Sequence, residues 1–82
     1  MNDWSVYMLR CADGSLYTGI AKDLSARLAT HNAGKGAKYT RARLPVRLVW
    51  SETAEDRSMA TKREMAIKKL NRSRKLALIA QA

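Results

Sequence analysis

Apolar and polar positions alternate in two stretches near the start of the chain, Trp4–Arg10 and Ser15–Ala21, which are rich in Val, Tyr, Thr and Ile. Alternation with a period of two is typical of β-strands with one buried face. The Asp13-Gly14 pair that separates the stretches favours a tight turn. The pattern therefore predicts a β-hairpin.

The next segment has the period of a helix. Asp23 is a good N-cap residue and Gly34 a good C-terminal stop, so we expect a helix from Asp23 to about Ala33. The residues that repeat at helical spacing are Leu24, Leu28 and His31. Residues 34–44 then form a basic, glycine-containing loop with room for one helical turn, and Pro45 closes it.

The second half of the chain repeats this scheme of a strand followed by helices. Val46, Leu48 and Trp50 alternate with Arg47, Val49 and Ser51, which predicts a strand with one apolar face on the core. Glu55 and Asp56 suit the positive end of a helix that runs to a break at Asn71. Its apolar stripe comprises Met59, Ala60, Arg63, Ala66, Ile67 and Leu70. Ser73 is the expected cap of a last helix, Arg74–Ala80.

The predicted order of elements is β-β-α-β-α-α, which implies an α+β fold with a small three-stranded antiparallel sheet covered by helices. We expect one domain over residues 1–82, too small for a large enclosed substrate cavity. The N-terminus lacks the features of a secretion signal, and the lone Cys11 cannot form an internal disulfide. Both observations favour the cytoplasm. Cys11 itself is expected to be a small, half-buried filler rather than a reactive thiol.

Net charge changes this picture, because it is large and unevenly placed. The formal charge is +9: residues 1–33 hold three basic and three acidic side chains, whereas residues 34–82 hold thirteen basic and four acidic ones. A field of this kind suits a polyanion such as nucleic acid. The alternative, a merely solubilising surface, does not require so high a charge on so small a domain.

Glu64 stands out among the acidic residues. On a helical wheel it lies between Ala60 and Ile67, so its carboxylate points along the apolar stripe. A buried carboxylate without a cation costs several kcal/mol or stays protonated. Glu64 therefore needs a partner, which is either Arg27 or Lys68 in a structural ion pair or a divalent metal in a site.

Four other residues have both an ordinary interpretation and a functional one. Arg27 and His31 lie four residues apart at the edge of the helix face that meets the sheet, where they would either pack and pair or share a phosphate. Tyr7 and Tyr17 lie in the two predicted hairpin strands, where aromatic residues are common for structural reasons alone.

The arrangement of these residues resembles the GIY-YIG nuclease superfamily. Tyr7 lies in Val6-Tyr7-Met8, Tyr17 follows ten residues later in Tyr17-Thr18-Gly19, Arg27 follows after another ten, and Glu64 lies on a later helix. Within the superfamily the chain is similar to the small single-domain bacterial members. Further matches are His31-Asn32, Lys35-Gly36-Ala37-Lys38-Tyr39-Thr40 and Ile67-Lys68-Lys69-Leu70, so that the resemblance covers residues 4–79.

The resemblance implies metal-assisted hydrolysis of phosphodiester bonds with low sequence specificity. Glu64 would hold one divalent ion, magnesium or manganese. Water and a phosphate oxygen would supply the other ligands of this ion. Arg27 would neutralise charge in the transition state. His31 would relay a proton or bind a phosphate.

The resemblance also gives the two tyrosines a role. Tyr7 or Tyr17 would orient or deprotonate the attacking water, once a metal, Arg27 or Lys22 lowers the pKa of the phenol. The sequence does not choose between Tyr7 and Tyr17.

Nucleic acid is the expected partner, DNA rather than RNA, with a protein partner that would supply specificity and DNA repair as the process. Tyr39 would stack on a base or join the active-site network. The residues expected to contact the phosphate backbone are Lys22, Lys35, Lys38, Arg41 and Arg43. The alternatives are a non-catalytic nucleic-acid-binding module, favoured by the single acidic ligand and by Ile20 where the repair nucleases have a lysine, and a basic protein-interaction domain.

A shared site for the two tyrosines requires a particular hairpin. Directly opposite residues of an antiparallel pair share a face and have numbers of constant sum, and only an even sum puts Tyr7 and Tyr17 on one face. A three-residue loop of Ala12, Asp13 and Gly14, with Gly14 left-handed, gives a sum of 26. We therefore predict this loop, or another of odd length. Tyr7 would then pair with Gly19, which has no side chain to obstruct substrate, and Tyr17 with Leu9.

Overall fold

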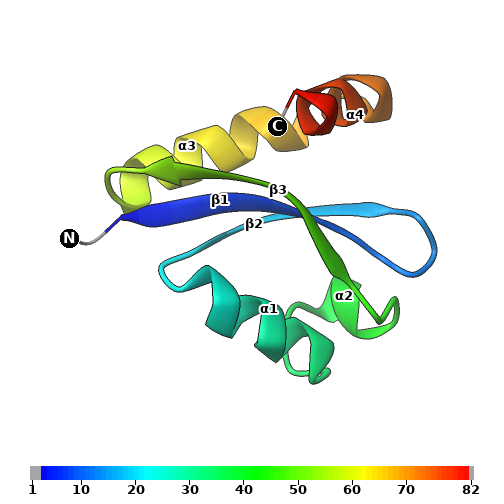
Figure 1. The fold of residues 1–82 in the computed structure, drawn as a ribbon. Helices are drawn as coiled ribbons and strands as arrows, with labels where there is room; N and C mark the ends of the chain where they lie inside the picture. The colour runs from blue at the N-terminus through cyan, green and yellow to red at the C-terminus, as the bar shows by residue number, and fades with distance from the viewer. Residues whose placement is uncertain (1–2, 82) are drawn as a thin grey trace.

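A computed structural model describes residues 3–81, and its elements follow the predicted order (Figure 1). The strands are β1 (Trp4–Arg10), β2 (Leu16–Ala21) and β3 (Arg47–Ala54). The helices are α1 (Leu24–Asn32), α2 (Lys38–Arg41), α3 (Arg57–Lys68) and α4 (Arg72–Ala80). The strands form one antiparallel sheet in the order β2-β1-β3, which confirms the predicted α+β fold.

Helices cover both faces of the sheet, with α1 and α2 on one side and α3 and α4 on the other (Figure 1). The core under α1 and α2 consists of Tyr7, Leu9, Cys11, Ala21 and Val46. The core under α3 and α4 consists of Val6, Met8, Trp50, Ala60 and Ile67. Because successive side chains of a strand point to opposite faces, the central strand β1 supplies both cores.

The third strand differs from its predicted form. The register between β1 and β3 shifts between Met8 and Leu9, which pair with Trp50 and Leu48, so that one extra residue of β3 forms a bulge. A shift of one residue moves the following side chains to the other face. Trp50 and Val46 therefore pack in different cores, and the prediction of a single apolar face is wrong.

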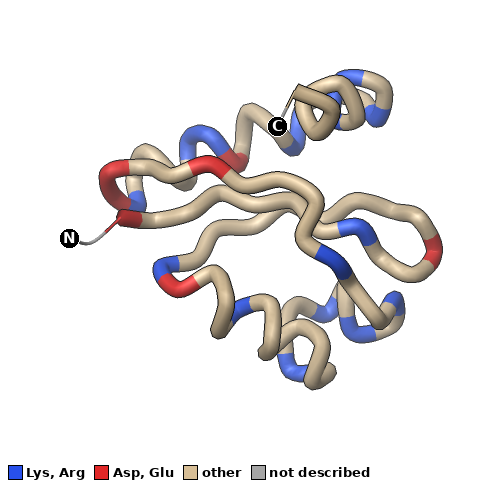
Figure 2. The backbone as a smooth tube through the Cα atoms, viewed as in Figure 1, with Lys and Arg blue, Asp and Glu red and all other residues tan. Residues whose placement is uncertain are grey.

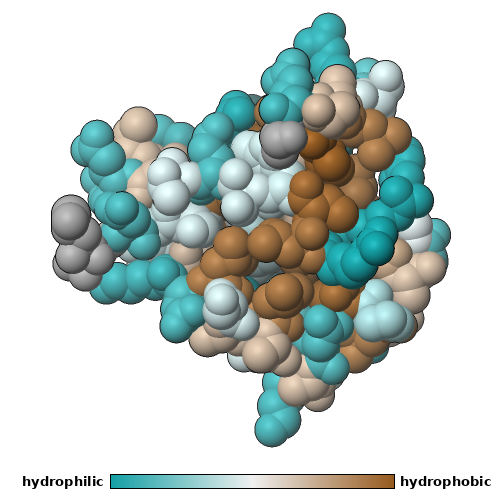
Figure 3. Space-filling model, viewed as in Figure 1, coloured by the Kyte–Doolittle hydropathy of each residue, from teal (hydrophilic) through white to brown (hydrophobic). Residues whose placement is uncertain are grey.

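Because β3 is an edge strand of the sheet, part of it is not covered by other elements. Leu48, which was expected in the core, is 40% exposed. In the view of Figure 3, apolar side chains gather in a band over β3 and the C-terminal helix, between hydrophilic regions.

Side-chain caps set the starts of the long helices. The carboxylate of Asp23 accepts a hydrogen bond from the backbone N–H of Ala26, and Asp56 caps α3 in the same way. Asn71 accepts a hydrogen bond from the N–H of Arg74, so α4 begins at Arg72 and the predicted Ser73 cap is wrong. Asn71 is an equally good cap and comes first. No helix between residues 3 and 81 is long and apolar enough to span a membrane.

Helix α3 packs through a narrower stripe than predicted. Ala60 and Ile67 are fully buried, whereas Met59 is 53% exposed and Ala66 is also exposed. Arg63 turns outward and its Nε donates to a glutamate of β3 at 2.9 Å. The helix therefore contacts the sheet along one line of small and branched residues.

The hairpin loop has the three residues predicted, 12–14. The N–H of Cys11 donates to the carbonyl of Ser15, and the N–H of Gly14 donates back to the carbonyl of Cys11, both at 2.9 Å. Gly14 has a φ of 85°, in the left-handed region that glycine adopts without strain. Hydrogen bonds from the Ser15 side chain and backbone hold the pKa of Asp13 below its ordinary value.

Candidate active site

The hairpin register brings the two strand tyrosines together. Tyr7 pairs with Gly19 and Leu9 pairs with Tyr17, which is the even register predicted from the loop. Tyr7 and Tyr17 therefore lie on the same face of the sheet, the face covered by α1 and α2. Their ring centroids are 6.4 Å apart. The geometric condition for a shared site is confirmed.

Gly19 leaves room for the side chains of the two tyrosines. A Cβ atom at this position would lie 2.6 Å from the hydroxyl oxygen of Tyr7 and 3.1 Å from the ring of Tyr17. The Tyr7 hydroxyl therefore occupies the space that a side chain at position 19 would need. A side chain here would displace the buried phenol.

His31 on α1 connects Tyr7 to α2. Its ring is almost fully buried, with Nε2 at 2.9 Å from the Tyr7 hydroxyl and Nδ1 at 2.8 Å from the Thr40 hydroxyl. The Thr40 hydroxyl donates its only proton to the carbonyl of Ala37 at 2.9 Å, so its oxygen accepts from His31. Nδ1 therefore carries the imidazole proton, and Nε2 accepts the proton of Tyr7.

Two residues of this network had no assigned role in the sequence. Thr40 is fully buried, and a Cβ atom at Gly36 would collide with the His31 ring. Both lie in the run Lys35–Thr40 that carries the family resemblance. That shared run was the only signal that could have found them, because a buried threonine and a loop glycine have many structural explanations.

Burial keeps the central pair neutral near pH 7. Burial, with a smaller effect of the Arg27 charge, holds the pKa of His31 below its ordinary value. Burial and the neighbouring Tyr17 raise the pKa of Tyr7 to about 12. Arg27 acts in the opposite direction on Tyr7, as expected from the sequence, but burial outweighs it. Arg27 alone therefore does not make Tyr7 an available base.

Arg27 and Glu64 approach the same phenol from different helices. The charge of Arg27, which is exposed on α1, lowers the pKa of Tyr7, and the charge of Glu64 on α3 raises it. The side chain of Glu64 is 18% exposed, and its Oε2 lies 3.4 Å from Nζ of Lys68. Of the cations considered for Glu64, the structure pairs it with Lys68 and not with Arg27.

The oxygen donors near this phenol suit a metal ion only in part. Residues 3–81 contain no cluster of three or more His, Cys, Asp or Glu side chains that could hold an ion. One partly buried carboxylate, Glu64, fits a hard ion such as magnesium when water and substrate phosphate supply the other ligands. Such an ion would take the place of the Lys68 ammonium group.

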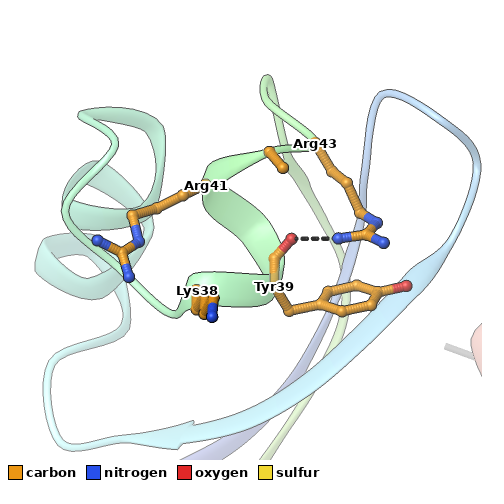
Figure 4. A pocket seen from close by; sticks show the side chains of 5 residues that line it. Lys38, Tyr39, Arg41 and Arg43 are labelled. Carbon is orange, nitrogen blue, oxygen red and sulfur yellow. Dashed lines mark hydrogen bonds between the residues drawn. The ribbon is translucent and has the colours of Figure 1, made fainter.

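Tyr39 on α2 joins the aromatic cluster. Its ring is stacked on that of Tyr17, with centroids 6.1 Å apart and planes inclined by 23°. The Arg43 guanidinium lies 3.9 Å from the centre of the Tyr39 ring and donates to the Tyr39 carbonyl (Figure 4). Arg43 also forms an ion pair with Asp13 at 3.1 Å. Arg43 thus links α2 to the hairpin loop through these contacts.

The basic residues proposed to contact nucleic acid fall into separate groups. Lys38, Arg41 and Arg43 line an open hollow of about 690 Å³ on α2, in which Arg41 and Arg43 point in opposite directions (Figure 4). Lys22 lies with Arg27 in a second hollow of about 360 Å³. Lys35 is exposed in the turn after α1 and lines neither hollow.

The whole-chain charge distribution agrees with this arrangement. Figure 2 shows basic positions along α1, α2, α3, α4 and the start of β3, whereas acidic positions gather where β3 turns into α3. The helices α1 and α2 therefore lie away from the main group of acidic positions (Figure 2).

Comparison with known proteins places this geometry in a family. The profile of the GIY-YIG catalytic domain matches residues 3–77. The chain belongs to the GIY-YIG family. This family is one of nucleases, which supports a phosphodiesterase activity in general and implies a nucleic-acid substrate.

Relatives of this GIY-YIG domain are similar over most of their length. UPF0213 proteins of Staphylococcus aureus strains Mu3 and Mu50 are each 54% identical over 79 residues, which is 96% of both chains. The solution NMR structure of a UPF0213 protein from Bacillus halodurans has a TM-score of 0.63 and 42% identity, covering 96% of this chain and 84% of that one. A second NMR structure, from E. faecalis, has a TM-score of 0.62 and 45% identity over 92% and 80%.

Proposed function

We propose that this GIY-YIG domain is a metal-dependent nuclease that hydrolyses phosphodiester bonds in nucleic acid, DNA rather than RNA, with low sequence specificity. The observation that carries the proposal is the contact of 2.9 Å between the Tyr7 hydroxyl and Nε2 of His31. It links a phenol to a neutral imidazole nitrogen that accepts protons, beside Arg27 and Glu64.

The Tyr7–His31 pair provides a route for the proton of the attacking water. A phenol with a pKa near 12 is almost fully protonated at neutral pH and is a poor base by itself. Tyr7 can nevertheless take the proton from water if it passes its own proton to Nε2 of His31 at the same time. His31 then becomes an imidazolium whose Nδ1–H still donates to Thr40. Tyr17, partly exposed on the same face, would orient the water or the phosphate.

Arg27 would stabilise the phosphate during the reaction. Its side chain is exposed and forms no ion pair with another residue of the described part of the chain. A free guanidinium beside the phenol can bind phosphate oxygens in a bidentate manner. Because negative charge grows on these oxygens in the transition state, a fixed donor of this kind typically contributes about 3–4 kcal/mol.

Glu64 would hold the divalent ion. GIY-YIG nucleases typically use divalent metals, and magnesium or manganese would polarise the phosphate and the attacking water. Because Glu64 is one carboxylate and is paired with Lys68, we expect appreciable metal binding only when nucleic acid supplies further oxygen ligands.

The basic side chains would hold the nucleic-acid backbone. Lys38 and Arg41 on α2 extend the reach of the site beyond Tyr39, while Lys22 lies beside Arg27. Contacts of this kind carry little sequence information, and they make affinity fall with salt by a log-log slope of about −0.9 per phosphate on duplex DNA. Lys35 and Arg43 are further candidates for such contacts.

A cleavage assay with Glu64→Ala tests the proposal. We expect wild-type protein to cut DNA when magnesium or manganese is added, and Glu64→Ala to lose at least about a hundredfold in rate, in the range of other lost transition-state interactions. Glu55→Ala removes the same charge from an exposed residue just before α3 and should cut normally. Thermal unfolding of each variant checks the fold.

The assay also separates the catalytic function from the alternative one. Wild-type protein that binds DNA but does not cut it with either metal would be a non-catalytic binding module on the same scaffold. Equal cutting by wild type and Glu64→Ala would leave Glu64 as the structural partner of Lys68.

A further inference from the structure

The outer edge of β2 carries a small cavity that the proposed roles do not use. β2 is an edge strand, and Figure 1 shows that its start lies between α2 on one side and α4 on the other. The cavity has a volume of about 290 Å³. It is lined by Leu16, Tyr17, Thr18, Tyr39, Lys68 and Lys75. Helices from both faces of the sheet therefore contribute to one site.

Two lysines line this one cavity, and no carboxylate residue lines it with them. Lys68 comes from α3 and Lys75 from α4, and no acidic residue is among the lining residues. Lys75 forms no ion pair with any residue between 3 and 81. Lys68 already pairs with Glu64, so Lys75 is the charge at this cavity that a bound anion would neutralise.

The cavity also adjoins the candidate active site. Tyr17 lines the cavity, and its ring centroid lies 6.4 Å from that of Tyr7 and 5.4 Å from that of His31. Lys68 lines the cavity and contacts Glu64 at 3.4 Å. An anion bound here would therefore be a close neighbour of a phosphate that is held for hydrolysis.

Size and lining decide which part of a nucleic acid fits. Pockets that enclose a drug-sized ligand have volumes of about 300–1,000 Å³, and this open cavity, at the lower limit of that range, suits a small part of a nucleic acid. Its apolar residues, Leu16 and the two tyrosine rings, suit a sugar, and its two lysines suit a phosphate. The groups that would read a base edge bidentately, such as Asn, Gln or Arg, are not among the lining residues.

We propose that this cavity binds a backbone phosphate of a nucleic-acid strand that passes over the candidate active site. This inference rests on the proposed function only in taking nucleic acid as the ligand, and it adds α4 to the contact surface. The strand then runs from α2 across the edge of β2 to Lys75. Binding at the cavity does not require hydrolysis.

Lys75→Gln tests this inference against Arg72→Gln as a matched control. Both changes remove one positive charge from α4, but Arg72 does not line the cavity. Lys68 is unsuitable for the test because it is also the partner of Glu64. The probe is a fluorescein-labelled single-stranded DNA of about 16 nucleotides, the upper end of single-strand site sizes. Anisotropy is measured in a chelator at several salt concentrations, and a gel checks that the DNA stays intact.

We expect Lys75→Gln to weaken binding about five- to tenfold and to reduce the salt slope by about 0.7, which corresponds to one lost single-strand phosphate contact. Arg72→Gln should change both values much less. Equal effects of the two variants, or wild-type binding by Lys75→Gln, would overturn the inference. Wild-type protein that does not bind the DNA at all would overturn it as well.

A second measurement keeps the test independent of the variants' stability. In a titration of isotope-labelled wild-type protein with the same DNA, the amide signals of Leu16, Thr18 and Lys75 should shift. Shifts confined to α1 and α2 would exclude the cavity. If Lys75→Gln weakens binding but the wild-type protein cuts no DNA with added metal, the proposed nuclease is contradicted and the inference stands. If the wild-type protein cuts DNA but Lys75→Gln binds it normally, the inference is contradicted and the proposed nuclease stands.

Discussion

The two faces of the sheet bury different chemistry. The face under α3 and α4 is almost entirely apolar, built around Val6, Met8, Trp50, Ala60 and Ile67. The face under α1 and α2 buries a phenol, an imidazole and a hydroxyl, those of Tyr7, His31 and Thr40. On this second face each buried polar group has a hydrogen-bond partner.

The difference shows how one short strand serves stability and chemistry together. Apolar burial is not directional and contributes roughly in proportion to area. A buried polar chain depends on direction, because each member must be met by the correct donor or acceptor. β1 alternates between the two faces, so Val6 and Met8 add to the apolar core while Tyr7 between them enters the polar network. We therefore expect changes on the first face to alter stability and changes on the second to alter catalysis.

The largest expected effect on stability is that of Ile67→Ala on the apolar face. Ile67 is fully buried, and truncation of such a residue typically costs about 2–5 kcal/mol. A domain of this size is stable by only about 4–12 kcal/mol, so a large part of the total is lost. Urea denaturation measures the change, and Ile67→Val should cost only about 0.5–1.5 kcal/mol. If folded Ile67→Ala protein cut DNA more slowly than folded wild type, Ile67 would be part of the site. The two faces would then not differ in function as proposed.

Thr40→Val is the corresponding change on the polar face. Without the Thr40 oxygen, Nδ1–H of His31 has no acceptor, and the other tautomer, which donates to Tyr7 rather than accepting from it, becomes populated. We expect cleavage to fall by about ten- to a hundredfold, with a stability cost of about 1–3 kcal/mol.

Thr40→Ser is the control for this change, because a serine hydroxyl can accept the same hydrogen bond. It should restore most of the activity, and nitrogen NMR of the imidazole should show the Nδ1–H tautomer in wild type and Thr40→Ser only. The prediction would be contradicted if Thr40→Val kept that tautomer and cut as well as wild type.

Some features of the site were predictable from the sequence, because they depend only on the length of the hairpin loop or on the type of a single residue. The three-residue loop around Gly14 determines whether Tyr7 and Tyr17 share a face, and the prediction was correct because the register depends only on loop length. Asp23 was identified as an N-cap from its residue type alone. His31 was placed on the inner edge of its helix by helical spacing, and it is buried there.

Features that depend on how distant elements meet were not predictable. The bulge that puts Trp50 and Val46 in different cores was not predicted, because the apolar Val49 interrupts the alternation of residues 46–51 but does not by itself indicate an extra residue in the strand. Thr40 reaches His31 only because α2 packs against α1, which no periodicity indicates. The pKa of Tyr7 was expected to fall, but the degree of burial, which decides its direction, follows from the assembled fold.

The pH dependence of stability should reflect the polar face. Because folding lowers the pKa of His31 from 6.5, the unfolded chain binds more protons below that value, and the free energy of unfolding falls as the pH drops through it. Tyr7 acts at the alkaline end. Its pKa is raised from 10.0 to about 12, so its contribution is present below pH 10 and is lost as the pH rises toward 12.

Urea unfolding of wild type and His31→Gln from about pH 7.5 to 5.5 tests the acid part of this prediction. Wild type should lose more stability than the variant over this range, because glutamine does not titrate and the carboxylates are common to both. A difference between the two proteins that stays constant with pH would show that His31 is not held neutral by its burial.

The smallest expected effect concerns the one exception on the apolar face. Thr18 is 3% exposed, pairs with Met8, and its hydroxyl has no hydrogen-bond partner within residues 3–81. An unpaired buried hydroxyl is costly, so Thr18→Val, which keeps the shape, should stabilise the protein by about 1 kcal/mol in urea denaturation. Thr53→Val, on an exposed position of β3, should change stability by less than about 0.5 kcal/mol. If Thr18→Val instead destabilised the protein, the hydroxyl would have a partner in solution and the apolar face would hold a polar contact of its own. If Thr18→Val stabilised the protein but weakened DNA binding, the Thr18 hydroxyl would contribute to binding at the cavity on the edge of β2. The apolar face would then take part in function at that edge.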